Sequence, residues 1–339
     1  MRYLPVSVAL AGTVAWGLAG AADESPLARY QYTQLHMGVQ VRIVVYAPSR
    51  AAAETACEAA FERFAQLDQT LSDYRPSSEI NRLCDAAGGP PVRVSRDLYR
   101  VLERAQQVSR RSGGAFDVTV GPLVALWRAA RKSGRLPADP ELRAARALVG
   151  WRKVRLLPRE RAVRLATPGM RLDLGGIAKG YAGDCAQAVL RRRGIRSALV
   201  EAGGDIVVSD APPGRAGWEI EAQERGGTRT LVLANSAVST SGDTEQFVEV
   251  DGRRYSHVVD PRTGLGLTTR VAATVVAPDG LTSDPLSTAV CILGPEKGPA
   301  FAAAWKRVRA TVRRAGDPSP AGTGQQPTDP SPNRGATTP

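Results

Sequence analysis

The spacing of apolar residues predicts alternating strands and helices along most of this 339-residue chain. Residues 31–46 are rich in β-branched side chains and predict an opening strand. After Ser49, a residue suited to cap a helix, apolar residues recur at helical spacing as far as Leu71. The same spacing recurs over 95–112 and over 177–194, where it predicts two further amphipathic helices that end at Ser and Gly residues.

The rest of the pattern is mainly β structure with two closing helices. Residues 218–276 favour strands, with a hairpin at 251–252, and helices are expected near 285–293 and 296–310. The arginine-rich segment 128–146 indicates exposed helix and loop. Further short strands are predicted at 163–165, 170–174, 198–200 and 206–208.

The domain organisation follows from composition along the chain. Neither an internal repeat nor a Pro/Gly-rich linker interrupts residues 30–310, so these elements predict a single mixed α+β domain. Before it, residues 6–22 are uncharged, small and apolar, and a small-x-small site at 19–21 predicts a signal peptide over 1–21. After it, residues 311–339 are rich in Pro, Gly, Ser and Thr and predict a disordered tail.

The predicted signal peptide indicates export, which in a bacterium means a periplasmic location. The alternative to a cleaved signal peptide is an uncleaved segment, which would keep the protein attached to the inner membrane. An exported compartment permits disulfides, but the sequence selects no pair among Cys57, Cys84, Cys185 and Cys291. None of the four belongs to a C-x-x-C pair, so a zinc site is not supported.

The chain is basic, with 45 Lys and Arg against 33 Asp and Glu and a formal charge of +12. The basic residues are scattered, and aromatic residues make up only 5% of the chain. Nucleic-acid binding would call for a basic stripe interleaved with stacking aromatics, which the sequence lacks. The charge therefore indicates a solvated basic surface and argues against a nucleic-acid partner.

A glycine turn at 172–182 is the first candidate for chemistry. It reads as a strand end, a turn and the first turn of a helix that carries Lys179. Backbone N–H groups, the helix dipole and the lysine charge would together suit a phosphate or diphosphate. The alternative is that the glycines serve only close packing. The turn matches neither the G-x-G-x-x-G pattern nor the Walker A pattern.

A second candidate lies at 282–288, where Asp284 and Thr288 are four residues apart. At the start of a helix both side-chain oxygens would lie on one face. A carboxylate and a hydroxyl there can hold Mg²⁺, with water and phosphate as the other ligands. The alternative is an Asp helix cap with a Thr bonded back to the preceding turn.

Three more candidates follow: two single segments and one pair of segments. His257 lies between the predicted hairpin and a tight turn, flanked by Asp260 and Arg262, and is a candidate base near neutral pH, although a lone histidine is more often structural. The Gly-Gly pair at 113–114 permits close approach of a flat ligand. Met37-Gly38 on the first strand and Tyr74 in the first loop form the last pair, because the tyrosine can stack on a ring.

Together and in this order, these motifs resemble the ApbE-type FAD:protein FMN transferase family over roughly residues 30–310. The resemblance implies that family's mixed α+β domain, with FAD in a cleft between its lobes. Each motif is modest alone, and their number and order carry the likeness. The matching segments are His36–Gly38, Ser72–Glu79, Gly113–Trp127, Asp173–Ala182, Glu201–Asp205, Thr240–Asp243, Ser256–Gly264 and Thr282–Ala289.

The resemblance also implies roles for individual residues. Asp284 and Thr288 match the family's Mg²⁺-binding side chains, and Gly176 matches a position that offers a backbone carbonyl. His257 matches the histidine proposed as general base, and Lys179 would stabilise the phosphate oxygens. Val258 lies where the family packs against the flavin. The positions that match FAD contacts are Met37, Tyr74, Ala115, Phe116, Asp117, Asp173, Lys179, His257 and Val259.

The implied activity is Mg²⁺-dependent transfer of FMN from FAD to a Thr or Ser hydroxyl of an acceptor protein, with release of AMP. The acceptor would carry a D-G-x-T-S/T-G/A motif and be an exported or membrane-anchored electron-transfer subunit. Two alternatives stay open: a Mg²⁺-dependent FAD pyrophosphatase that gives FMN and AMP, and a non-catalytic exported FAD-binding protein.

Two departures from the family pattern and one coincidence stand out. Val39 replaces the usual Thr, which removes a hydroxyl near the ligand. Pro285 replaces Ala and is expected to be tolerated at a first helical position. Residues 279–284 also resemble the acceptor motif itself, which we attribute to chance because short motifs often match by accident.

Overall fold

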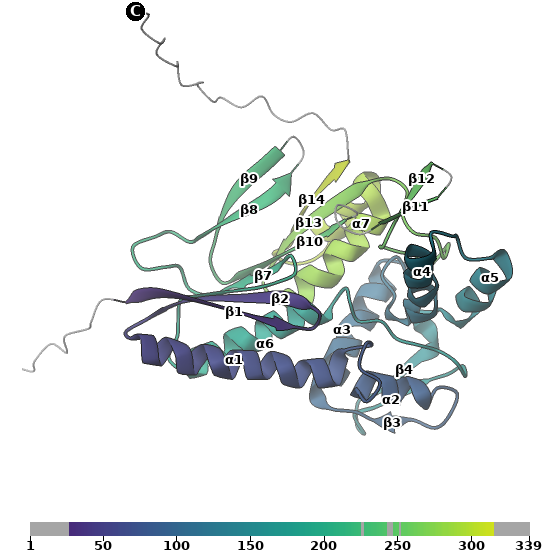
Figure 1. Cartoon of the computed structure of the whole chain (residues 1–339), viewed down its shortest axis with the longest axis horizontal. Coiled ribbons are helices and arrows are strands. Elements are labelled where there is room, and N and C mark those ends of the chain that lie inside the picture. Colours follow the sequence, from purple (N-terminus) through teal and green to yellow (C-terminus); the bar gives the residue numbers. More distant parts are fainter. Residues whose placement is uncertain (1–26, 225–226, 243–246, 251, 315–339) are drawn as a thin grey trace, which may run out of the picture.

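The computed structural model describes residues 27–224, 227–242, 247–250 and 252–314 (Figure 1). Its centre is a seven-stranded sheet in the order β1-β2-β6-β7-β10-β13-β14, with antiparallel neighbours throughout. These strands are β1 (Ala28–His36), β2 (Val39–Ala47), β6 (Ala198–Ala202), β7 (Asp205–Val208), β10 (Ser236–Gly242), β13 (Val271–Ala277) and β14 (Arg309–Arg314).

The central sheet is buried on both faces, which the side-chain alternation of β2 shows. Val41, Ile43 and Val45 join the main core beneath the helices, whereas Val44 joins a second cluster with Trp218 on the opposite face. The hairpin that covers this opposite face consists of β8 (Trp218–Glu224) and β9 (Gly227–Leu233). The helices that pack on the main-core face of the sheet are α1 (Arg50–Leu71), α6 (Ala178–Arg192) and α7 (Gly280–Ala303).

The remaining elements gather beyond one end of this sandwich, around α3 and α4 (Figure 1). A three-stranded sheet has the order β3-β5-β4, and a third apolar cluster joins α4 and α5 to the β11–β12 hairpin. The helical elements are α2 (Glu79–Asp85), α3 (Arg96–Arg111), η1 (Val118–Val120), α4 (Gly121–Ser133), α5 (Asp139–Leu148) and η2 (Trp151–Lys153). The strands are β3 (Val92–Arg93), β4 (Val154–Leu157), β5 (Ala162–Leu165), β11 (Phe247–Val250) and β12 (Arg253–Ser256).

The structure confirms the predicted mixed α+β fold and most of its elements. Ser49 caps α1 by accepting a hydrogen bond from the backbone of Ala52, and Ser95 caps α3 in the same way. The helix predicted over 177–194 is α6, and the antiparallel pairing of β11 with β12 agrees with the predicted hairpin, although residue 251 of its turn lies outside the described residues.

Two predicted strands differ in the structure. Residues 31–46 form a hairpin rather than one strand, because Met37 and Gly38 both take positive φ angles, 51° and 73°, and reverse the chain between β1 and β2. Residues 170–174 are irregular although apolar and charged residues alternate along them. Their backbone pairs instead with the short helix η1, as the bond from the Asp173 N–H to the Val118 carbonyl shows.

The C-terminal boundaries also move. The two predicted closing helices are confirmed as the two segments of α7, which are separated at Gly294, where φ is 73°; the first begins at Gly280 and the second ends at Ala303. Pro285 therefore lies inside the helix and not at its first position, which corrects the expectation for that residue. Residues 311–314, placed in the predicted tail, belong to β14 and pair with β13.

The chain ends carry two expectations that the structure leaves as predictions. The signal peptide over 1–21 and the tail from residue 315 onward lie outside the described residues. Within the described ranges, no helix is long and apolar enough to cross a membrane.

Candidate functional site

Helices α6 and α7 cross with their backbones in contact, and this contact positions most of the predicted site. A Cβ on Gly180 would lie 2.2 Å from the carbonyl oxygen of Gly280, and the reverse substitution would meet the same obstacle. Only glycine at both positions allows so close an approach. Asp184 adds a second link, because its carboxylate accepts hydrogen bonds from the backbone N–H groups of Gly280 and Leu281 at 2.7 and 2.8 Å. The start of α7 is thereby fixed on α6.

Lys179 lies in the first turn of α6, as the sequence predicts. Its ammonium donates to the carbonyl of Gly175 at 2.8 Å and forms an ion pair with Asp205 at 3.2 Å. Burial alone would lower the pKa of this lysine, but the carboxylates of Asp284, Asp205 and Asp173 outweigh burial and raise the pKa. Lys179 is thus a permanently charged group that faces three carboxylates.

Asp284 occupies the place where the sequence predicted a free anion site. Its Oδ2 accepts a hydrogen bond from the backbone N–H of Gly180 at 3.0 Å, so a carboxylate of α7 already uses the N-terminus of α6. Burial, and then the nearby charge of Asp205, raise the pKa of Asp284 to about 7, against the lowering effect of Lys179. The junction therefore holds an excess of carboxylate oxygen, which suits a cation more than a second anion.

The predicted metal ligands lie together at this junction. Gly180 is the third residue of α6, so its N–H has no acceptor within the helix, and it donates to Asp284. A Cβ on Gly176 would lie 2.8 Å from the hydroxyl oxygen of Thr288, which in turn is 3.2 Å from the hydroxyl of Ser241. The donor set is one carboxylate, one hydroxyl and one carbonyl, all oxygen, and this composition fits Mg²⁺ with water or phosphate completing the shell.

The described residues contain no group of three or more His, Cys, Asp or Glu side chains placed to hold a metal ion. Mg²⁺ is usually held by one or two carboxylates together with phosphate oxygens of a substrate, and the single carboxylate of Asp284 fits that arrangement.

A second part of the site is built around the guanidinium of Arg128 in α4. It donates to Asp73 at 2.5 Å and to Asp173 at 2.9 Å, and its central carbon lies 4.2 Å from the centre of the Tyr74 ring. Tyr74 is 73% exposed, so the ring offers its other side to solvent. The predicted contacts Tyr74 and Asp173 are therefore brought together by Arg128, which the sequence analysis left among the scattered basic residues.

Asp173 connects the two parts of the site. Its second oxygen accepts the N–H of Gly175 at 2.8 Å, and the carbonyl of Gly175 binds Lys179. Burial and then the charge of Asp73 raise the pKa of Asp173, while Arg128 opposes the shift. Hydrogen bonds of the turn at Asp173 and Gly175 thus connect Arg128, which supports the Tyr74 ring, to the ammonium of Lys179.

The predicted contacts at 115–117 are deeply buried. Ala115 is fully buried, Phe116 is 4% exposed, and the ring of Phe116 approaches Gly176. Both oxygens of Asp117 are engaged by the protein, one with Thr119 and the other with the N–H of Trp151 at 2.7 Å. In the structure, Asp117 shapes this loop rather than presenting a free carboxylate.

Met37 lies in the turn between β1 and β2, partly buried against the main core. The turn packs on the next one along the sheet, where a Cβ on Gly203 would lie 2.9 Å from a methyl group of Val39. Since Gly203 and Gly204 directly precede Asp205, the partner of Lys179, the structure puts Met37 at the same edge of the sheet as the lysine.

His257 follows β12 and is half buried, in a loop that α4 holds in place. Trp127 donates from its indole N–H to the carbonyl of Gly264 at 2.8 Å, and Val259 packs in the same apolar cluster. An ion pair between Arg262 and Asp260 at 2.8 Å closes the turn. Adjacent residues of α4 therefore anchor two segments of the predicted site: Trp127 the His257 loop, and Arg128 the Tyr74 loop.

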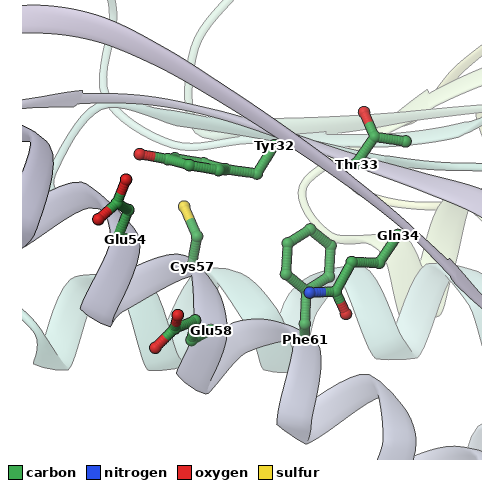
Figure 2. A pocket seen from close by; sticks show the side chains of 7 residues that line it. All are labelled: Tyr32, Thr33, Gln34, Glu54, Cys57, Glu58 and Phe61. Atoms are coloured by element: carbon green, nitrogen blue, oxygen red, sulfur yellow. The ribbon is translucent and has the colours of Figure 1, made fainter.

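A separate open hollow of about 280 Å³ lies between β1 and α1. Figure 2 shows its seven lining residues, with Cys57 rising from α1 toward Tyr32 of β1. None of these seven is a predicted site residue, and burial raises the pKa of the Cys57 thiol to about 12. The four cysteines of the chain are all free.

These features define an α+β protein with a mixed-charge oxygen site at a helix junction and an exposed aromatic platform connected to it. A model of the ApbE family matches residues 37–312. The chain belongs to the ApbE family, which confirms the resemblance inferred from its motifs.

Individual relatives agree with this assignment. The chain is 35% identical over 302 residues to the FAD:protein FMN transferase of Treponema pallidum (strain Nichols), covering 83% of each sequence. It is 33% identical to a protein of the same name from Klebsiella pneumoniae (strain 342), covering 79% of this chain and 84% of that one. Among solved structures, the flavin transferase ApbE from Vibrio cholerae superposes with a TM-score of 0.77 at 30% identity, covering 84% of this chain and 93% of the other.

Proposed function

We propose that this protein is an Mg²⁺-dependent FAD:protein FMN transferase, which moves FMN from FAD to a Thr or Ser hydroxyl of an acceptor protein and releases AMP. The observation that carries the proposal is the convergence of Lys179, Asp284, Thr288 and Gly176 at the junction of α6 and α7. It is supported by membership of the ApbE family and by relatives that bear this activity in their names.

Asp284, Thr288 and the carbonyl of Gly176 would hold Mg²⁺. When bound, the ion neutralises charge on the diphosphate of FAD and on the departing AMP. Asp284 is suited to this role because its carboxylate is desolvated and already oriented by the Gly180 N–H. Lys179, held between Gly175 and Asp205, lies in the same cluster of charges and would stabilise the phosphate oxygens as charge shifts onto them.

Two further parts of the site would position the reactants. Tyr74 would stack on a ring of FAD, and Asp173 would accept a hydrogen bond from a polar group of the substrate rather than face its phosphates. His257 would take the proton of the acceptor hydroxyl as its oxygen attacks the FMN-side phosphorus. The new P–O ester bond forms as the diphosphate P–O bond breaks, and AMP leaves with the bonding electron pair.

We further propose that the acceptor carries a D-G-x-T-S/T-G/A motif and is an exported or membrane-anchored electron-transfer subunit, and that this chain is itself exported. The chain's own copy of a similar motif is a poor acceptor. Thr282 is 5% exposed, and its hydroxyl donates at 2.6 Å to Asp279, the residue that precedes α7. The structure gives a physical reason to treat that match as coincidence.

The test is to mix the full chain with FAD, Mg²⁺ and a candidate acceptor that carries the motif, and to record the intact mass of the acceptor. A gain of one FMN phosphoester that EDTA abolishes would support the transferase. Free FMN and AMP with an unchanged acceptor would indicate the pyrophosphatase instead. Intact FAD together with unmodified protein, repeated with a second acceptor, would indicate a binding protein.

A further inference from the structure

Arg128 joins three separate segments of the chain through one side chain. It extends from α4, and its partners come from the loop after α1 and from the turn before α6. Its two terminal nitrogens serve different carboxylates, those of Asp73 and Asp173. The side chain is only 28% exposed, so these charge-assisted bonds form in a partly desolvated place where they are stronger than on the open surface.

The same guanidinium lies over the Tyr74 ring, at 4.2 Å from its centre. A ring that is 73% exposed has few apolar neighbours to fix its orientation. A planar cation held by two carboxylates supplies that support on one side and leaves the other side for a ligand. Asp73 and Tyr74 are adjacent in sequence, so Arg128 contacts two neighbouring side chains of the same loop, the Asp73 carboxylate and the Tyr74 ring.

We propose that Arg128 is a positioning residue for FAD, which acts by holding the Tyr74 ring as a preformed stacking platform and by orienting Asp173. This inference rests on the proposed function, because it takes Tyr74 and Asp173 as contacts of FAD. It predicts that affinity for FAD depends on the planar fork of Arg128 and not only on its charge.

Lysine cannot replace arginine in this arrangement. An ammonium on a flexible stem keeps the charge but cannot bridge two carboxylates in a fixed plane while stacking on a ring. In Arg128→Lys we therefore expect the dissociation constant for FAD to rise about tenfold, since base–aromatic stacking contributes on the order of 1–3 kcal/mol and part of it would be lost.

The experiment measures FAD binding to the full chain by quenching of flavin fluorescence. The variants are Arg128→Lys and Asp73→Asn, which removes the charge of one carboxylate partner of Arg128 and leaves the Tyr74 ring in place. The control is Lys132→Gln, at an exposed position on the same helix; it removes a positive charge, which Arg128→Lys keeps, and therefore tests whether charge on α4 alone affects binding. Both site variants should bind FAD more weakly than the wild type, and Lys132→Gln should bind it about equally well.

A double-mutant comparison shows whether Arg128 acts through the ring. In a Tyr74→Leu background, the further change Arg128→Lys should weaken FAD binding by less than about threefold, because the platform is already gone. A purely structural role would give the same tenfold loss in both backgrounds and would overturn the proposal. The proposal would also be overturned if Arg128→Lys and Asp73→Asn both bound FAD as tightly as the wild type.

The two levels of inference fail differently. If the wild-type chain bound no FAD, the proposed function and this inference would both fall. If the wild type bound FAD and transferred FMN while Arg128→Lys bound FAD equally well, the assignment of Arg128 alone would fall.

Discussion

The two parts of the site are built in opposite ways. The α6–α7 junction (Lys179, Gly180, Gly280 and Asp284) depends on backbones in contact and on buried charges. The Tyr74 wall (Tyr74, Arg128 and Asp173) depends on side chains that reach across half-exposed space. A close-packed junction fixes atoms where charge must be stabilised, whereas a wall held by side chains can adjust to a large ring. Substitutions should therefore be more costly at the junction than at the wall.

The largest effect is expected from Asp284→Asn at the junction. The variant keeps the side-chain shape but offers Mg²⁺ a neutral amide, and loss of several kcal/mol of electrostatic stabilisation corresponds to about a thousandfold slower transfer. The rate of FMN transfer at saturating Mg²⁺ and FAD measures the effect, and a urea unfolding curve checks that the protein stays folded. A folded variant with wild-type activity would remove Asp284 from the metal site.

Gly180→Ala tests the backbone contact itself. The new Cβ would lie 2.2 Å from a backbone carbonyl that cannot swing aside, so we expect the free energy of unfolding to fall by about 3 kcal/mol. The control is Gly194→Ala after the other end of α6, where a Cβ meets nothing within 4 Å and only the positive φ of 84° is costly, about 1 kcal/mol. Equal losses in the two variants, measured by urea unfolding, would contradict the close-contact argument.

The junction was largely predictable from sequence, and the wall was not. Gly175 to Lys179 and Asp284 to Thr288 are short local segments, so helical spacing alone puts Asp284 and Thr288 on one face of a helix, although α7 begins earlier than expected, at Gly280. Arg128 lies 55 residues from Asp73 and 45 from Asp173, and no local pattern singles it out among many arginines. Only the folded chain shows that one helix joins the two loops.

The errors in the predicted fold have the same origin. Alternation over 31–46 is identical for one long strand and for a hairpin, and the deciding feature is the left-handed backbone at Met37, a residue type that rarely adopts it. Met170, Leu172 and Leu174 alternate with charged residues because they pack into the main core beside η1, not because they join a sheet. The expectation that Pro285 begins a helix failed because Asp184 caps α7 five residues earlier, from another helix.

His257 belongs to neither part, and its replacement should separate binding from chemistry. The variant His257→Gln has no side chain that can accept the proton of the acceptor hydroxyl, and we expect the turnover number to fall about a hundredfold. The dissociation constant for FAD should change by less than about threefold, as measured by flavin fluorescence. A large loss of FAD affinity with normal turnover would assign His257 to binding instead.

The buried charge of the junction predicts a dependence of stability on pH. Because burial raises the pKa of Asp284 to about 7, above its unfolded value near 3.9, the folded state keeps a proton that the unfolded state loses. This contribution to stability is complete below about pH 4 and is lost as the pH rises through 7.

Urea unfolding in EDTA at about pH 5 and pH 8 measures this dependence. Between these conditions the wild type should lose about 1 kcal/mol or more relative to Asp284→Asn, which has no proton to release at this position. Parallel behaviour of the two proteins would show that the carboxylate is solvated in the folded state. Addition of Mg²⁺ at about pH 8 should stabilise the wild type and not the variant.

The smallest effect is expected from Tyr74→Phe at the wall. The phenyl ring keeps the face that Arg128 supports and the face that is open to solvent, so stacking is retained and the dissociation constant for FAD should change by less than about twofold. Tyr74→Leu, which removes the ring, should raise the constant about tenfold. If the phenol were needed for a hydrogen bond, Tyr74→Phe would weaken FAD binding as much as Tyr74→Leu does. The wall would then act through a fixed polar contact, and its contrast with the junction would disappear.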